Sequence, residues 1–233
     1  MHRFYVPAEN FRGNYVISGD LGLIGQLSKV LRARHGDKCL VFNGSGAEYV
    51  CQLVDLGKKE VRFLIIDQRP GSREPLRRVV LYQSLLKSDK LEWLIQKAVE
   101  LGVHRVVPVI SRYSIVKDIT PAKRRRYEDI IKEAAEQCGG VRLPELSAAA
   151  PFQAAIESAG KQAGAKIIAW EKETEYDLTD AATDDIQLFI GPEGGYSLEE
   201  IEAAKSRQII PVTLGNRILR AETAAIAALA KLL

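Results

Sequence analysis

The sequence predicts an α/β protein with a small β-rich N-terminal domain, residues 1–70, and a larger C-terminal domain, residues 75–233. Three observations support this prediction. Short apolar stretches separated by Gly, Asn and Asp fill the first part, as is typical of strands joined by tight turns. The second part alternates strand-like and helix-like patterns, which indicates a mostly parallel sheet covered on both faces. Between them, Gln68–Pro75 contains two prolines and a glycine and is predicted to be a linker.

In the N-terminal part the expected strands are short runs of apolar residues. They are Asn14–Ser18, Lys38–Phe42, Glu48–Leu53 and Glu60–Ile66. The residues Asn43–Gly46 have the composition of a hairpin turn. One segment, about Leu23–Leu31, has apolar residues at helical spacing. Together these elements predict a small barrel or half-barrel.

In the C-terminal part five apolar runs are expected to form strands. They are Val79–Gln83, Arg105–Ile110, Lys166–Trp170, Gln187–Ile190 and Ile209–Val212. A helix capped by Ser88 or Asp89 should end at Gly102, and Thr120-Pro121 should open a second helix that runs to about Gln137. The sequence Ser197-Leu-Glu-Glu200 has the pattern of a capping box, and the chain closes with an expected helix over Glu222–Leu233.

Composition and charge narrow the class of protein. The residues are 46% hydrophobic and 27% charged, which is ordinary for a globular protein, and no apolar run approaches the roughly 20 residues that span a bilayer. Lys and Arg outnumber Asp and Glu by 10 to 7 in residues 1–72 and by 15 to 9 in residues 73–144, but are outnumbered 8 to 14 in residues 145–233. This asymmetry favours a polyanionic partner at the basic part, although solvated helix faces would give the same counts.

Cysteine and histidine usage argues against a disulfide framework and a metal site. The three cysteines (Cys39, Cys51 and Cys138) are far apart and odd in number, and the three histidines (His2, His35 and His104) are scattered. The first residues lack the basic-then-apolar pattern of a signal peptide. We therefore expect a cytoplasmic protein without a bound metal.

Phe189–Ser197 is the strongest candidate for a ligand site. A buried strand runs into a turn containing Gly191, Gly194 and Gly195, and a capped helix follows. Glycines let the backbone approach a ligand closely, and ligands of open α/β sheets bind beyond the carboxyl ends of the strands. A tight strand–helix connection without a ligand remains the alternative. The spacing is neither a dinucleotide fingerprint nor a P-loop.

Val212–Ala224 is the second candidate. The segment holds Gly215, two arginines three residues apart (Arg217 and Arg220) and the pair Glu222-Thr223 before the last helix. The spacing of the arginines suggests that both lie near one ligand. The alternative is a charged loop whose Glu222 or Thr223 only serves the helix N-terminus.

Taken together, the two segments resemble the cofactor-binding motifs of the SPOUT methyltransferase superfamily. More closely, the chain resembles the 16S ribosomal RNA uridine-N3 methyltransferases, and the similarity extends over nearly its whole length. Beside Ile190–Gly195 and Leu214–Ala224, the segments that carry the resemblance are His2–Val6, Val30–Arg32, Phe42–Gly46, Lys87–Gly102 and Glu133–Cys138. Each is weak alone, but their order and spacing are specific.

The resemblance implies an N-terminal PUA-like RNA-binding β-barrel and a C-terminal SPOUT domain whose chain forms a deep trefoil knot. It implies that S-adenosyl-L-methionine is the cofactor, that the protein is a homodimer, and that the product is N3-methyluridine in 16S rRNA of the small ribosomal subunit. The residues implied to bind the cofactor are Trp170, Phe189, Ile190, Gly191, Pro192, Gly194, Gly195, Leu214, Gly215, Ile218, Leu219, Thr223 and Ala224.

Methyl transfer to N3 of a uridine requires loss of its proton, so an arginine beside the base and a carboxylate acceptor are expected. Arg220 is the candidate for the first role, and Glu193 or Glu222 for the second. Arg3, Arg32, Arg34 and Arg112 are the candidates for RNA phosphate contacts.

The chain departs from the family's pattern in three places. Gln26 stands where a histidine is usual, Tyr113 where an arginine is usual, and Ala221 where a threonine is common. The first two departures put RNA contacts at those positions in doubt. The competing interpretations are a SPOUT methyltransferase with a different RNA target and a non-catalytic ribosome-assembly factor of the same fold.

Overall fold

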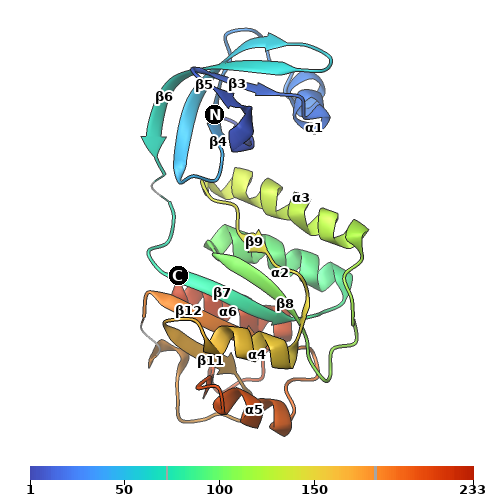
Figure 1. The fold of residues 1–233 in the computed structure, drawn as a ribbon, viewed down its shortest axis with the longest axis vertical. Helices are drawn as coiled ribbons and strands as arrows, with labels where there is room; N and C mark the ends of the chain where they lie inside the picture. The colour runs from blue at the N-terminus through green and yellow to red at the C-terminus, as the bar shows by residue number, and fades with distance from the viewer. Residues whose placement is uncertain (72, 181–182) are drawn as a thin grey trace. The chain divides into compact units, whose positions relative to one another are not determined.

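The computed structural model describes residues 1–71, 73–180 and 183–233 of the chain (Figure 1). Contacts between residues divide it into two compact units. The first contains Met1–Glu74 and Ala135–Leu143, and the second contains Pro75–Ala134 and Pro144–Leu233. The sequence did not indicate that residues 135–143 belong with the N-terminal residues. Hydrogen bonds explain why they do, since Glu136 accepts one from the backbone N–H of Tyr5 at 2.9 Å.

The first unit is built on a curled six-stranded sheet in the order β1-β4-β5-β6-β3-β2. Its strands are β1 (Arg3–Tyr5), β2 (Phe11–Arg12), β3 (Tyr15–Ser18), β4 (Lys38–Phe42), β5 (Ala47–Leu56) and β6 (Val61–Pro70). β1 and β4 are parallel, and the other neighbours are antiparallel. The buried side chains of Phe4, Val41 and Phe63 lie in its core.

The predicted hairpin over Asn43–Gly46 is confirmed, because it joins β4 to β5 with Gly44 and Gly46 at positive φ. Three details differ from the sequence prediction. The helix expected over Leu23–Leu31 is a short helix, α1 (Leu21–Gly25), followed by a π-helical turn, η2 (Gln26–Val30). β1, β2 and the 3₁₀ turn η1 (Ala8–Asn10) were not predicted. The predicted linker is wrong in its first residues, since β6 continues to Pro70 by pairing with Ala47 of β5.

The second unit contains a parallel sheet in the order β10-β8-β7-β12-β11-β13, with β9 beside β8. Its strands are β7 (Arg78–Ser84), β8 (Arg105–Ile110), β9 (Glu145–Leu146), β10 (Ala150–Pro151), β11 (Ala165–Ala169), β12 (Asp185–Ile190) and β13 (Ile210–Val212). Its helices are α2 (Ser88–Leu101), α3 (Pro121–Cys138, whose last residues belong to the first unit), α4 (Phe152–Gly160), η3 (Leu178–Asp180), α5 (Leu198–Lys205) and α6 (Ala221–Leu232).

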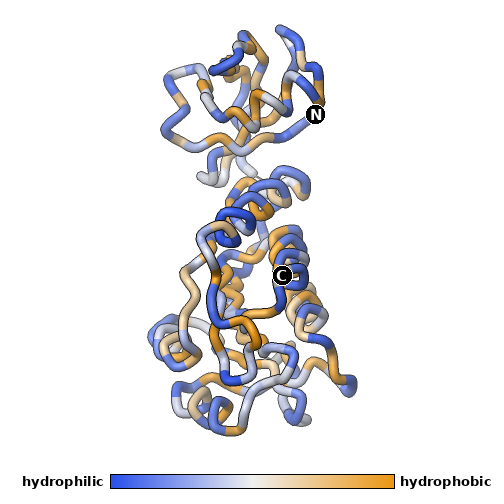
Figure 2. The backbone as a smooth tube through the Cα atoms, turned by 90° about the vertical axis from the view of Figure 1, so that its right-hand side faces the viewer, coloured by the Kyte–Doolittle hydropathy of each residue, from blue (hydrophilic) through white to orange (hydrophobic). Residues whose placement is uncertain are grey.

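Helices cover both faces of this sheet, as predicted. On one face, α4 and α5 pack on a buried cluster that includes Tyr82, Phe152 and Phe189. On the other, α6 packs against α2, β7 and β12. Because β7 is buried on both faces, consecutive residues such as Leu81 and Tyr82 are both buried. Figure 2 shows apolar and hydrophilic residues alternating along the helices, as amphipathic helices on a sheet require.

The N-cap residues of α5 and α3 are the predicted ones, and that of α2 is not. In α5, Ser197 accepts the N–H of Glu200 at 3.3 Å and the Glu200 carboxylate accepts the N–H of Ser197 at 3.0 Å, so the capping box is confirmed. Thr120 accepts the N–H of Lys123 at 3.4 Å and caps α3. The predicted cap of α2 is wrong, because the helix already begins at Ser88 and Lys87 is the N-cap.

The segment 145–160 was not predicted at all. β9 and β10 have two residues each, too few for a periodic pattern. α4 has no side-chain cap at its N-cap residue, Pro151.

None of the described helices is long and apolar enough to cross a membrane.

Candidate functional site

A pocket of about 560 Å³ lies where β11, β12 and β13 end. These strands are neighbours and parallel, so the loops that follow them meet at one edge of the sheet. The residues that line the pocket are Lys90, Ala169, Trp170, Glu171, Ile190, Gly191, Pro192, Glu193, Gly194, Gly195, Tyr196, Thr213, Leu214, Gly215, Asn216, Arg217, Ile218, Leu219, Arg220, Ala221 and Ala224. Its volume is within the range of roughly 300–1,000 Å³ that is usual for small-molecule sites.

The glycine-rich turn after β12 forms one wall, and its geometry explains the glycines. Gly195 donates its N–H to the carbonyl of Pro192 at 3.0 Å and has a φ of +69°. A Cβ at Gly194 would lie 2.9 Å from the Cβ of Tyr113, and one at Gly191 would lie 3.3 Å from the ring of Tyr196. Side chains are therefore disfavoured at these three glycines, whose main-chain groups line this wall of the pocket.

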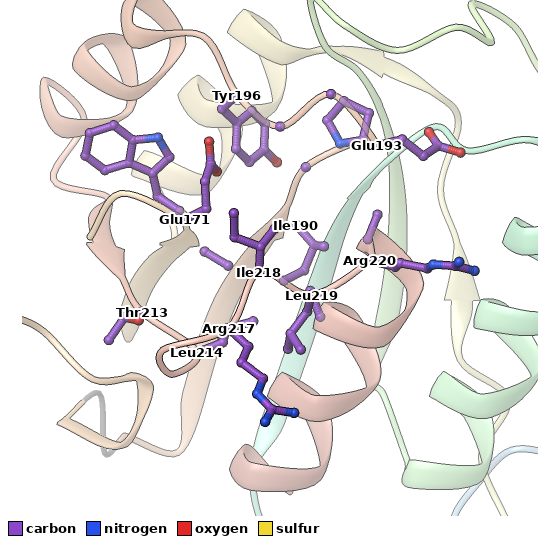
Figure 3. A pocket seen from close by; sticks show the side chains of 18 of the residues that line it. Glu171, Ile190, Glu193, Tyr196, Thr213, Leu214, Arg217, Ile218, Leu219 and Arg220 are labelled. Atoms are coloured by element: carbon purple, nitrogen blue, oxygen red, sulfur yellow. The ribbon is translucent and has the colours of Figure 1, made fainter. Parts of the chain in front are cut away.

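The pocket has an apolar middle and two polar ends (Figure 3). Ile190, Ile218 and Leu219 lie between them. Glu171 lies at one end, and Glu193 and Arg220 extend toward the other. Such a lining suits a ligand that has both apolar and polar parts.

Charged groups from three segments meet at the second end. The Nζ atom of Lys90, on α2, lies 3.2 Å from Oε1 of Glu193 and 3.8 Å from Oε2 of Glu222. Glu222 is in the first turn of α6, where the helix dipole favours a carboxylate. Its Oε2 atom is buried and accepts no hydrogen bond from any described residue. The cluster therefore fixes Lys90 between two carboxylates.

Most residues predicted to bind the cofactor line this pocket. They are Trp170, Ile190, Gly191, Pro192, Gly194, Gly195, Leu214, Gly215, Ile218, Leu219 and Ala224. Of the three catalytic candidates, Arg220 and Glu193 line it too, and Oε2 of Glu222 lies 3.8 Å from Nζ of Lys90, which is also in the lining.

Two predicted cofactor residues are not in the pocket lining. Phe189 is fully buried in the core and stacks on Tyr82 with ring centroids 4.3 Å apart. Its neighbour Ile190 lines the pocket instead. Thr223 is exposed on α6, because Ala221 and Ala224, three residues apart, form the face that the helix turns to the pocket.

The pocket also contains residues that the sequence analysis did not assign to the cofactor. They are Lys90, Ala169, Glu171, Tyr196, Thr213, Asn216, Arg217 and Ala221. Glu171 could have been found, since it directly follows Trp170. Lys90 lies about a hundred residues before the glycine-rich turn, and nothing in the sequence spacing connects the two. Arg217 and Arg220 both line the pocket but extend in different directions (Figure 3).

The four arginines predicted to contact RNA differ in their surroundings. Arg3 forms an ion pair with Glu48 at 2.6 Å and donates to the carbonyls of Gly139 and Gly140, so its guanidinium is engaged within the first unit. These contacts hold the guanidinium on the protein itself, so Arg3 is a weaker candidate for a phosphate contact than the exposed arginines. Arg32 and Arg34 have exposed side chains. Arg112 is exposed and pairs with Glu199 at 3.0 Å.

Of the three positions where the chain departs from the family pattern, Gln26 and Tyr113 are exposed and Ala221 is buried. Gln26 begins the π-helical turn η2, and Tyr113 lies under the Arg112 guanidinium with 5.7 Å between the guanidinium carbon and the ring centroid. Within the described residues, no group of three or more His, Cys, Asp or Glu side chains is arranged to hold a metal ion.

Comparisons with known proteins match this architecture. A family model described as an RNA methyltransferase domain covers residues 72–233, and one described as an RNA methyltransferase PUA domain covers residues 27–66. The chain is 32% identical to the ribosomal RNA small subunit methyltransferase E of Bacillus subtilis over 88% of this chain and 85% of the relative. It is 30% identical to the protein of that name from Buchnera aphidicola subsp. Schizaphis graminum, over 94% of this chain and 90% of that relative.

A solved structure is similar over almost the whole length. It is the crystal structure of a ribosomal RNA small subunit methyltransferase E from Neisseria gonorrhoeae bound to S-adenosyl methionine. The TM-score is 0.89 and the sequences are 32% identical, with 99% of this chain and 95% of that chain covered.

Proposed function

The chain belongs to the RNA methyltransferase family, and from this premise we propose that it transfers a methyl group from S-adenosylmethionine to N3 of a uridine in 16S rRNA of the small ribosomal subunit. The observation that carries the proposal is the pocket formed by the glycine-rich turn and the loop 213–221. The names of the relatives support rRNA as the substrate, and the cofactor bound to the Neisseria gonorrhoeae protein supports the choice of cofactor.

The residues present fit this cofactor. Gly191, Gly194 and Gly195 have no side chains and leave room for close approach, and Ile190, Ile218 and Leu219 offer an apolar surface. Trp170 and Leu214 contribute further walls. When bound, the cofactor supplies an electrophilic methyl group on a sulfonium.

The protein's own contribution is to position the base and to stabilise charge. Uridine N3 becomes nucleophilic once its proton leaves, and the Arg220 guanidinium stabilises the anion that results. Glu193 is the proton acceptor in this proposal, because it lines the pocket while Oε2 of Glu222 is buried. Glu222 then acts on Lys90, which it helps to hold against Glu193.

The first unit is proposed to bind the RNA. Its curled six-stranded sheet and the match of residues 27–66 to an RNA methyltransferase PUA domain support a PUA-like barrel, with residues 1–70 as the RNA-binding domain and residues 75–233 as a SPOUT domain. The exposed arginines Arg32, Arg34 and Arg112 remain the candidates for phosphate contacts.

A trefoil knot in the second unit is part of the same proposal. The chain leaves the edge strand β13 and returns to pack α6 on β7, β12 and α2 near the middle of the sheet. That return path supports threading of the C-terminal segment. We also propose that the protein acts as a homodimer and in the cytoplasm, where its proposed substrate is made.

One experiment tests the function. The purified protein is titrated with S-adenosylmethionine and then given small-subunit particles or naked 16S rRNA, and the modified nucleoside is identified by mass spectrometry. We expect cofactor binding and N3-methyluridine. Absence of binding would favour the non-catalytic assembly factor, and methylation of a ribose 2′-hydroxyl would show that the RNA target is different.

A further inference from the structure

The carboxylate of Glu171 lies in the pocket with both oxygens available. Glu171 directly follows β11 and is exposed. Its Oε1 and Oε2 atoms lie 3.3 and 3.4 Å from the place where a Cβ at Gly195 would be. No described residue forms a hydrogen bond or an ion pair with this carboxylate. The two oxygens are therefore free to accept hydrogen bonds from a ligand.

A glutamate of the same loop shows the contrast. The carboxylate of Glu173 accepts the N–H groups of Thr174, Glu175 and Tyr176, at 3.0, 2.8 and 3.4 Å. Its role is to fold the loop after β11. Glu171 has no such role, and it lies against the backbone of the glycine-rich turn instead.

The two ends of the pocket differ in the ligand groups that they can bind. The end with Lys90, Glu193 and Arg220 carries charges of both signs and contains the groups that are proposed to act on the uridine. The end with Glu171 offers a carboxylate, and none of the residues lining the pocket beside it (Ala169, Trp170, Gly195 and Tyr196) is a cation. A carboxylate accepts from two donors at once, which suits two neighbouring hydroxyl groups.

We infer that Glu171 binds the ribose of the cofactor by accepting hydrogen bonds from its two hydroxyls. This inference depends on the proposed function, because the cofactor is part of that proposal. It makes Glu171 the residue that selects a nucleoside with an intact diol. It also assigns the adenosine to the Trp170 end of the pocket and leaves the opposite end to the reacting groups.

The test is a set of binding titrations by calorimetry, without RNA. The ligands are S-adenosylhomocysteine, 5′-methylthioadenosine, which keeps the ribose but lacks the amino acid, and 2′-deoxy-5′-methylthioadenosine. The variants are Glu171→Ala, Glu171→Gln, and Glu175→Ala as a control. Glu175 carries the same charge in the same loop but does not line the pocket.

We expect Glu171→Ala to lower the affinity for S-adenosylhomocysteine and for 5′-methylthioadenosine by the same factor, about tenfold or more, because a hydrogen bond to a charged group is lost. Glu171→Gln, which keeps one acceptor oxygen, should lose less. The 2′-deoxy ligand should bind the wild type more weakly than its parent, and this difference should shrink in Glu171→Ala. Glu175→Ala should bind all three ligands like the wild type.

Three results would overturn the inference. If Glu171→Ala weakened only S-adenosylhomocysteine, the carboxylate would bind the ammonium group and not the ribose. If Glu171→Ala bound both ligands as tightly as the wild type does, Glu171 would have no part in binding. If the wild type bound neither S-adenosylhomocysteine nor 5′-methylthioadenosine, the proposed function would fail together with the inference, and that outcome is distinct from the other two. Thermal unfolding of each variant checks that the fold is kept.

Discussion

The variant Phe189→Ala tests whether Phe189 is a core residue or a cofactor-binding residue. The ring is fully buried, stacks on Tyr82 at 4.3 Å with an interplanar angle of 8°, and meets Phe152 edge-on at 6.3 Å. Removing such a ring costs about 3–5 kcal/mol through lost burial and the cavity that remains. For a chain of this size each kcal/mol lowers Tm by about 2–4 °C, so we expect a fall of roughly 6–20 °C.

The assay combines thermal unfolding by circular dichroism with calorimetric titration of S-adenosylhomocysteine below the transition. Phe189→Ala should lower Tm strongly and leave the affinity of the folded protein nearly unchanged. Ile190→Ala is the matched control, because Ile190 is the next residue along β12 and lines the pocket. It should lose affinity as well as stability. If Phe189→Ala kept the Tm of the wild type but lost much of its affinity, Phe189 would be a cofactor-binding residue and the assignment to the core would be refuted.

Three further predictions concern the reaction, RNA binding and pH. Arg220→Ala should lower kcat by about 10²–10³-fold while cofactor affinity changes little, because it removes a group proposed to stabilise charge. Arg217→Ala, on the same loop but directed elsewhere, is its control, and equal losses in both would contradict the assignment. Arg32→Gly should fold at least as stably as the wild type, since Arg32 has a φ of +50°, but it should bind RNA with a log–log salt slope smaller by about 1. An unchanged slope would exclude a phosphate contact. The N–H of Glu175, followed by those of Tyr176 and Thr174, lowers the pKa of Glu173. The wild type should therefore be more stable than Glu173→Gln at pH 7, and unfolding curves should show this advantage disappearing as the pH falls through that lowered pKa.

The sequence predicted those parts of the structure that depend on neighbouring residues. The capping box of Ser197 and Glu200, the cap at Thr120 and the hairpin at Asn43–Gly46 are local arrangements of a few residues, so the sequence contains all of their determinants. The glycine-rich turn belongs to the same class, because positive φ at Gly195 is a property of that residue itself.

The errors come from interactions that the sequence order does not reveal. Ile186–Ile190 is buried throughout, so apolarity could not tell which side chains face the pocket and which face the core, as Phe189 does. Arg3 looked like an available cation because Glu48, its partner, is 45 residues away. α4 was missed because its start has no side-chain cap.

The pocket shows why its full lining could not be deduced residue by residue. β11 is flanked by β12 and β13, and this order in space differs from the order in the chain. Only that arrangement brings Glu171 to the glycine-rich turn, and only the packing of α6 on α2 brings Glu222 to Lys90. Because Lys90 contacts Glu193 as well, α2, the glycine-rich turn and α6 are joined through one ammonium group. A change in the start of α6 should therefore alter the position of Glu193, although the two segments are separate in the sequence. The variant Glu222→Gln tests this coupling. It should lower kcat in the wild-type background and have a smaller effect on kcat in the Lys90→Met background. Equal effects in both backgrounds would show that the two residues act independently.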